Sequence, residues 1–242
     1  MKKRGADAIL APVTNPLQNK HLVRLVWVGL WVVAGCGHKA PTKATPAQAT
    51  APLPLTALAG QQVMVLPLTL VAAEDSLHWE SLLPDRRTSL TRADSVVGTL
   101  LQARAPEVTW VLPDEVRRAA RRAPGIATDP DQMATGILRF QKLPVVPDPL
   151  RSQLRTLAAL AGGGGGQFAL VPAALVYKRS GGQAVGRSTA TAPQALAVAE
   201  LMIVLANVRT GKIEWRTTAS GEGGDPWSSL TRAVKKLTPG LP

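Results

Sequence analysis

Apolar and polar positions alternate in three different ways along the chain. Residues 25–35 form one apolar run, which directly follows a basic N-terminal stretch. Residues 36–60 are rich in Pro, Ala and Thr and have no apolar period. From Gln61 to about Pro239, helix-like and strand-like periods follow one another. This pattern predicts a leader over 1–35, a disordered spacer over 36–60 and a single folded domain over 61–239.

The periods in the folded region predict alternating strands and helices. The predicted strands are 63–71, 108–112, 168–177, 195–208 and 213–218. The predicted helices are 85–102, 113–124, 128–140, 150–161 and 227–237, of which 128–140 has the weakest pattern. The order is β-α-β-α-(α)-α-β-β-β-α, and the last strands are linked as hairpins. We therefore expect a mixed sheet of about five strands with helices packed on it, an α/β fold at the border with α+β.

Some residues predict local features of these elements. Pro67 interrupts the first strand, and Pro172 puts the register of the third strand in doubt. The almost continuous apolar run 195–208 is typical of a central strand that is buried on both faces. Gly211, in the sequence Arg-Thr-Gly-Lys, predicts a tight hairpin turn.

The leader has the order of a secretory signal: basic residues, an apolar run and then small residues. The run has 11 residues, whereas a membrane-spanning helix needs about 20. Its end, Val33-Ala34-Gly35-Cys36, resembles the bacterial lipobox. The resemblance implies cleavage before Cys36, attachment of lipid to its thiol, and acylation, for example by palmitate, of the new amino terminus. Several acyl chains on one residue would anchor the protein stably.

Cys36 is the only cysteine, so the chain can form neither an internal disulfide nor a thiolate metal cluster. Lipidation is the chemistry that remains well motivated for it. Residue 37 is Gly, whereas an Asp at this position tends to retain lipoproteins at the inner membrane of diderm bacteria. We therefore expect an anchor in the outer membrane, with the domain facing the periplasm.

Charge adds a candidate binding surface. Lys and Arg number 28 against 16 Asp and Glu, which gives a net charge of +12. A positive field favours anionic partners in general, although a GC-rich genome produces the same composition. Four arginines on the predicted helix 113–124 are candidate contacts for a polyanion, with a solvated helix face as the alternative: Arg117, Arg118, Arg121 and Arg122.

No catalytic set emerges from the sequence. The carboxylates between Asp85 and Asp148 show no spacing that pairs them for glycoside hydrolysis. The pattern G-x-S-x-G is absent, and only His38 and His78 follow Cys36. The glycines at 162–166 lie between a helix end and a strand, which favours a connector over a phosphate loop. We expect no enzyme, no metal and no cofactor.

The layout of 61–237 resembles a periplasmic α/β domain. This domain is shared by curli-secretion lipoproteins, outer-membrane lipoprotein activators of peptidoglycan synthases, and the N-terminal domain of the periplasmic Tol component. The segments that carry the resemblance are VLP at 65–67, VLPDE at 111–115, LAALAG and FALV within 157–171, and ANVRTGKIEW at 206–215. The signal, the spacer and the lack of a catalytic set predict a non-catalytic lipoprotein whose domain binds an envelope protein or a peptidoglycan-associated partner, and we expect no nucleic acid as partner.

Two other functions stay open at this point. A subunit of a curli-type secretion assembly would need long alternating strands, whereas the loops at 75–85 and 178–193 are short and polar. An envelope hydrolase would need a site that the sequence does not reveal.

Overall fold

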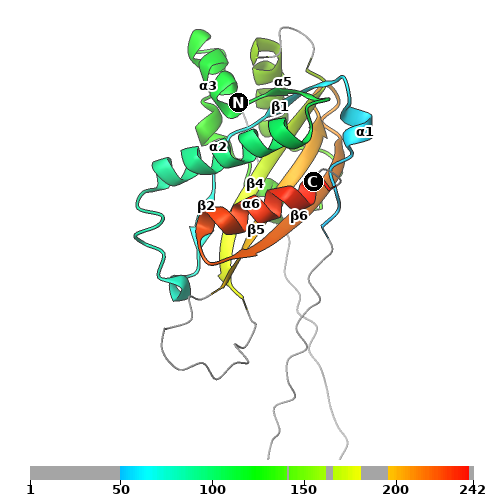
Figure 1. The fold of residues 1–242 in the computed structure, drawn as a ribbon. Helices are drawn as coiled ribbons and strands as arrows, with labels where there is room; N and C mark the ends of the chain where they lie inside the picture. Colours follow the sequence, from blue (N-terminus) through cyan, green and yellow to red (C-terminus); the bar gives the residue numbers. More distant parts are fainter. Residues whose placement is uncertain (1–49, 141, 162–165, 181–195, 240–242) are drawn as a thin grey trace, which may run out of the picture. The chain divides into compact units, whose positions relative to one another are not determined.

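The computed structural model describes residues 50–140, 142–161, 166–180 and 196–239 (Figure 1). The expected signal peptide, the lipobox with Cys36, and the spacer up to residue 49 lie outside the described residues. So do glycines 162–165 and most of the predicted loop at 178–193.

The core of the domain is a mixed, six-stranded sheet. Its strand order is β3-β1-β4-β5-β6, and β2 pairs with β4 beside β1. β1 pairs in parallel with β3 and β4, β2 pairs in parallel with β4, and the β4–β5–β6 pairs are antiparallel. The strands are β1 (Gln62–Val65), β2 (Val71–Ala73), β3 (Thr109–Val111), β4 (Phe168–Arg179), β5 (Ala197–Asn207) and β6 (Ile213–Gly223). The predicted α/β fold class is confirmed.

Helices cover both faces of the sheet. In Figure 1, α2 and α6 cross in front of β4, β5 and β6, and their apolar sides form one core cluster with the sheet. α3 and α5 form a second cluster with alternate strand residues, such as Met64 and Ala169. The helices are α1 (Leu55–Leu58), α2 (Arg86–Arg104), α3 (Pro113–Arg122), α4 (Ile137–Phe140), α5 (Leu150–Ala161) and α6 (Pro226–Leu237), with 3-10 turns η1 (Asp75–Leu77) and η2 (Pro130–Gln132). None of the described helices is both long enough and apolar enough to cross a membrane.

The predicted first strand, 63–71, is two short strands in the structure. β1 pairs with the start of β4, and β2 pairs five residues further along the same edge of β4. Between them the chain leaves the ladder at Pro67, which has no N–H to donate. The next N–H, of Leu68, donates to the Asp94 carboxylate at 2.8 Å. The prediction of one continuous strand was therefore wrong.

The predicted helix 128–140 is also wrong over most of its length. The structure has the 3-10 turn η2 at its start and the four-residue helix α4 at its end. Between them Thr135 is fully buried, and its hydroxyl lies 2.7 Å from that of Thr69. Tertiary contacts of this kind outweigh a weak helical pattern.

The C-terminal hairpins agree with the predictions. β5 lies between β4 and β6, as expected for a central strand. The β4–β5 register shifts between Pro172 and Ala174, which places an irregularity where Pro172 made the register doubtful. Gly211 has φ of +77° in the turn before β6, a backbone conformation that glycine adopts without strain.

The packed part of the chain begins before Gln61. Leu53 and Leu58 belong to the core, with 5% and 0% of their surface exposed. The Leu53 N–H donates to the Leu237 carbonyl at 2.7 Å, which joins the start of the described chain to the end of α6. Residues 50–60, which we expected in the spacer, are therefore part of the domain.

Candidate functional site

β2 uses one of its two edges to pair with β4. The Leu70 carbonyl accepts from the Leu175 N–H at 2.9 Å, and the Glu74 N–H donates to the Tyr177 carbonyl at 2.9 Å. In a parallel ladder, every second residue of a strand directs both its N–H and its C=O at one neighbouring strand, and the residues between direct theirs to the opposite side. Leu70 and Glu74 belong to the set that faces β4. The N–H and C=O groups of Val71 and Ala73 therefore face the other edge of β2.

This other edge is open. In the described part of the chain, the backbone groups of Val71 and Ala73 make no hydrogen bond across it. Thr69 belongs to the same outward-facing row, and its carbonyl accepts from Arg86 Nη2 at 2.7 Å. Arg86, in the first turn of α2, thus occupies the edge at one end and leaves Val71 and Ala73 unpaired.

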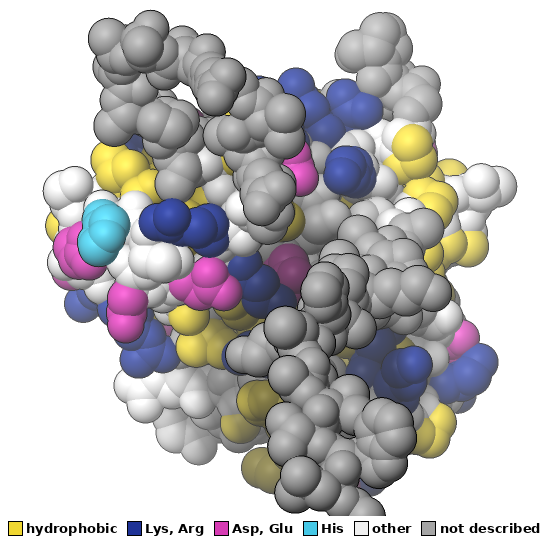
Figure 2. Space-filling view, turned by 90° about the horizontal axis from the view of Figure 1, so that it is seen from below, with side chains coloured by type: hydrophobic (Ala, Val, Ile, Leu, Met, Phe, Trp, Pro, Cys, Tyr) yellow, Lys and Arg dark blue, Asp and Glu magenta, His cyan; other side chains and the backbone are white. Residues whose placement is uncertain are grey.

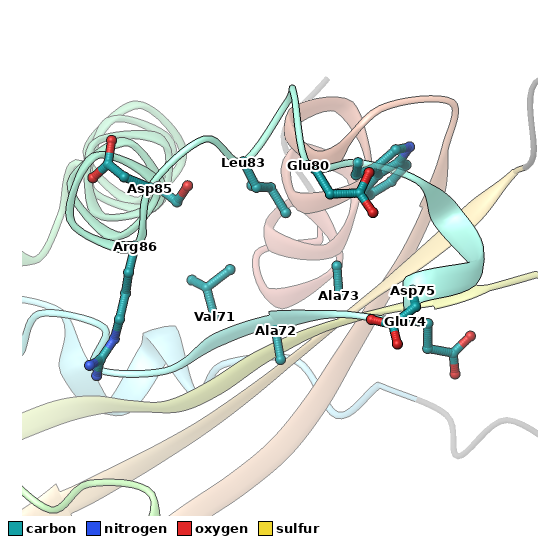
Figure 3. Close-up of a pocket in the computed structure, with 11 residues that line it drawn as sticks. Val71, Ala72, Ala73, Glu74, Asp75, Glu80, Leu83, Asp85 and Arg86 are labelled. Carbon is teal, nitrogen blue, oxygen red and sulfur yellow. The ribbon is translucent and has the colours of Figure 1, made fainter.

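A cleft of about 280 Å³ lies beside the open edge. Five consecutive residues, 71–75, line it. Successive side chains of a strand point to opposite faces. A cleft that consecutive residues line therefore extends around the edge of the strand. Figure 3 shows Val71 and Ala73 pointing into the space beneath Leu83, with Ala72 pointing away.

The inner wall of the cleft is apolar and well packed. Trp79 is 7% exposed, and its ring lies edge-on to that of Tyr177, with centroids 5.4 Å apart. Leu83 packs against the same core cluster. Ser89 also lines the cleft; it is 3% exposed, and its hydroxyl has no hydrogen-bond partner within the described chain. Such a buried, unpaired hydroxyl costs about 1–3 kcal/mol.

The rim of the cleft is acidic. Its carboxylates belong to Glu74, Asp75, Glu80 and Asp85, and Arg86 is the basic residue of the lining. Figure 2, seen from below, shows several acidic side chains gathered on one part of this face.

Two of these carboxylates already have structural partners. Glu74 accepts from the Arg179 N–H at 2.9 Å. Asp85 caps α2 by accepting from the Thr88 N–H at 2.8 Å, and the hydrogen bonds from Thr88 lower the pKa of Asp85. Among the described residues, Asp75 and Glu80 have no ion-pair partner, so both are available to a ligand.

Two carbonyl groups of β6, the last strand of the sheet, also accept hydrogen bonds from side chains elsewhere in the domain. The Thr218 carbonyl accepts from the Thr50 hydroxyl at 3.4 Å, and the Glu222 carbonyl accepts from Arg232 Nη1 at 2.5 Å. Proteins commonly protect sheet edges in this manner, because an open edge can pair with another chain. The open edge of β2 adjoins the cleft, and this combination makes it our candidate for a binding site.

Of the four arginines that we proposed as polyanion contacts, three are exposed and one is bound within the domain. Arg118, Arg121 and Arg122 lie on the exposed face of α3. Arg117 has a side chain that is 13% exposed and forms ion pairs with Asp94, Asp114 and Asp131. The guanidinium of Arg117 is thus bound to carboxylates within the domain. Only Arg118, Arg121 and Arg122 remain as candidate contacts for a polyanion.

Asp94 is the buried centre of this ion-pair network. Its Oδ1 accepts from the Leu68 N–H, and its Oδ2 accepts from Arg117 Nη2 at 2.5 Å. Burial raises the pKa of Asp94 to about 6, although the hydrogen bonds from Leu68 and Arg117 act to lower it. Burial acts to lower the pKa of Arg117, but hydrogen bonds to Asp131 and Asp94 raise it overall.

The network explains why the spacing of the carboxylates in the sequence showed no pairs. Asp94 and Asp131 stand 23 and 14 positions from Arg117, so no local spacing pairs them. Both oxygens of Asp94 are engaged within the domain, which leaves neither for a substrate. The network joins the segment after β1 to α2, α3 and η2. Within the described residues, no group of three or more His, Cys, Asp or Glu side chains is placed to hold a metal ion.

No protein-family model and no curated protein sequence matches the chain. Several solved structures are similar at low scores. The C-terminal domain of LpoB from Salmonella enterica has a TM-score of 0.37 and 14% identity, covering 67% of this chain and 82% of that one. The PelC dodecamer from Paraburkholderia phytofirmans has a TM-score of 0.35 and 13% identity, covering 78% and 94%. The lipoprotein GNA1162 from Neisseria meningitidis has a TM-score of 0.32 and 13% identity, covering 67% and 83%. Similarities this low do not assign the chain to a family.

Proposed function

We propose that the chain is an extracytoplasmic lipoprotein, anchored through lipid on Cys36, and that its α/β domain binds an envelope protein without catalysing a reaction. The sequence supports the anchor, because the basic stretch, the short apolar run and the small residues before Cys36 stand in the order of a lipoprotein signal. Gly37 favours the outer membrane, with the domain in the periplasm.

One observation carries the binding function: β2 presents unpaired backbone groups beside a cleft, whereas the buried carboxylate of Asp94 is hydrogen-bonded within the domain. A site of this kind suits recognition of another polypeptide, since an exposed sheet edge can pair with an extended chain. A catalytic site would instead need a reactive group that is free to meet a substrate.

The start of the packed domain also sets the length of the proposed tether. Residues 37–49 separate Cys36 from Thr50. In an extended, proline-rich conformation these 13 residues would span about 40 Å. That reach would hold the domain clear of the lipid headgroups while keeping it close to its own membrane.

The anchor is tested by expressing the full chain in a diderm bacterium supplied with labelled palmitate. We expect the chain to carry the label and to fractionate with the outer membrane. Cys36→Ala should abolish the label, whereas the control Thr42→Ala in the spacer should keep it. Label on the Cys36→Ala variant would contradict the proposed anchor.

Partner binding is tested with a photo-crosslinking amino acid at position 80, in the rim of the cleft, and at position 107 as the control. Glu80 and Glu107 are both exposed, but only Glu80 lines the cleft. We expect one envelope protein, identified by mass spectrometry, to crosslink at position 80 and not at 107. Absence of a crosslinked protein from both positions, and from a scan of other exposed positions, would contradict the proposed function.

A further inference from the structure

We propose that the open edge of β2 and its cleft bind an extended polypeptide segment bearing Lys or Arg, which adds to the sheet as a strand beside β2. This inference rests on the proposed function, because it names the chemistry of the partner's binding segment.

The backbone of β2 supplies the first part of the recognition. Val71 and Ala73 each offer one N–H and one C=O along the open edge. A strand laid beside them can form up to four backbone hydrogen bonds, at the usual strand spacing of about 4.8 Å. The Thr69 carbonyl already accepts a hydrogen bond from Arg86. The added strand would therefore pair only with the Val71–Ala73 segment of β2.

The cleft wall supplies the second part. Val71 and Ala73 point into the cleft, and Trp79 and Leu83 complete its apolar surface. Alternate side chains of an added strand would face this wall, which suits small or β-branched residues.

Charge selects among extended segments. The rim brings together Glu74, Asp75, Glu80 and Asp85 in a protein whose net charge is +12. Asp75 and Glu80 have no ion-pair partner within the described chain, so their charges are available to cationic side chains. A basic segment is therefore attracted, and an acidic one is repelled.

A second copy of this chain is a poorer occupant. Two β2 edges paired about a twofold axis would place identical surfaces against each other. The acidic rims would then meet, and like charges across an interface oppose association. The structure therefore favours a different polypeptide as the partner.

The test uses the full chain in detergent and a fluorescent peptide that alternates Lys with Val and Thr. We expect saturable binding by fluorescence anisotropy, weaker at high salt, with hydrogen-exchange protection of the Val71 and Ala73 amides. The same peptide with Glu in place of Lys, and a version N-methylated along one edge, should each bind at least about tenfold more weakly.

Two variants with a matched control locate the site. Asp75→Lys combined with Glu80→Lys should weaken binding about tenfold, whereas Glu107→Lys combined with Glu115→Lys, with the same change in net charge, should alter it less than about twofold. Ala73→Pro removes one outward N–H and spares the pairing with β4, so it should weaken binding with an unchanged circular dichroism spectrum. If this variant does not fold, the N-methylated peptide tests the same hydrogen bonds.

Several results would overturn the inference. Equal binding of the Lys and Glu peptides would remove the charge selection, and equal binding of the N-methylated peptide would remove strand addition. A dimer in sedimentation experiments that Ala73→Pro abolishes would assign the edge to a second copy. If an envelope partner crosslinks at another face and the peptide does not bind, the inference about β2 is refuted but the proposed function stands. If the peptide binds but the chain has neither an anchor nor an envelope partner, the proposed function is refuted but the inference about β2 stands.

Discussion

Arg86 Nη2 lies 2.7 Å from the carbonyl oxygen of Thr69, and this hydrogen bond closes the free edge of β2 at one end. The guanidinium comes from the first turn of α2 and crosses to the strand, as Figure 3 shows. The open edge is thereby limited to Val71 and Ala73, next to the acidic rim. Arg86 also places a positive charge beside the proposed site for a basic segment.

Replacing Arg86 should therefore strengthen binding of the Lys-containing peptide. Arg86→Met keeps the apolar stem, removes a repelling cation and frees the Thr69 carbonyl. We expect the dissociation constant in the anisotropy measurement to fall about two- to fivefold. Arg87→Met is the control, because the adjacent Arg87 is exposed but does not line the cleft. Weaker binding by Arg86→Met would show that the arginine contacts the ligand favourably.

Asp94→Ala should destabilise the domain strongly. The substitution leaves the Leu68 N–H without its acceptor and removes the buried partner of Arg117. We expect a loss of about 3–5 kcal/mol in the free energy of unfolding, measured with urea. Asp114→Ala is the control: its side chain is 80% exposed in its pair with Arg117, so it should cost less than about 1 kcal/mol. Equal losses in the two variants would contradict a central role for Asp94.

The cap of α6 predicts a loss of stability in acid. Asp225 accepts from the N–H groups of Trp227 and Ser228, and hydrogen bonds from Ser228 lower the pKa of Asp225 below its ordinary value of 3.8. A carboxyl whose pKa is lower in the folded state stabilises the fold above pH 3.8, and this contribution is lost as the pH falls through the folded-state value.

Variants at Asp225 separate the cap from its charge. Asp225→Ala should lower the free energy of unfolding at pH 7 by about 1 kcal/mol. Asp225→Asn should keep most of the cap but flatten the pH dependence of urea unfolding below pH 3.8. Asp75→Asn, at an exposed carboxylate outside any cap hydrogen bond, is the matched control for the loss of one carboxylate. A wild-type pH profile in Asp225→Asn would refute this assignment.

Gly221 marks the close approach of α6 to β6. A Cβ atom at this position would lie 2.3 Å from the Ala233 nitrogen and 2.3 Å from the Ser229 carbonyl oxygen. Gly221→Ala should therefore push the helix from the sheet and cost about 3 kcal/mol in thermal or urea unfolding. Gly136→Ala, where a Cβ meets nothing within 4 Å, should change stability by less than about 0.5 kcal/mol. A neutral Gly221→Ala would show that α6 can shift freely.

Features with local causes were predicted well. The long helices and the β5–β6 hairpin depend on side-chain periods, on caps such as Asp225 and on the turn at Gly211, all of which act within a few residues. Pro67 marked the interruption of the first strand, but the formation of two separate strands was missed. It depends on the pairing of β2 with β4 and on a distant carboxylate, Asp94, which accepts from the Leu68 N–H. The weak pattern at 128–140 was misread because Thr135 is held by Thr69 rather than by its own helix.

The candidate site was not foreseen for the same reason. No local pattern marks Val71 and Ala73 as unpaired, because their outward direction follows from the pairing of β2 with β4, about 100 residues later in the chain. The four arginines on α3 were visible as a group, but the enclosure of Arg117 required Asp94 and Asp131 from other elements.

The sequence by itself determined the α/β class and most helix boundaries, because these follow from composition, period and capping within short windows. The leader over 1–35, with cleavage before Cys36, stays a prediction. Only the tertiary structure decided that residues 50–60 join the core, that Arg117 is internal, and that the edge of β2 stays open. Each of these depends on which distant segments pack together, and pairing across a sheet or through a buried carboxylate leaves no periodic trace in the sequence.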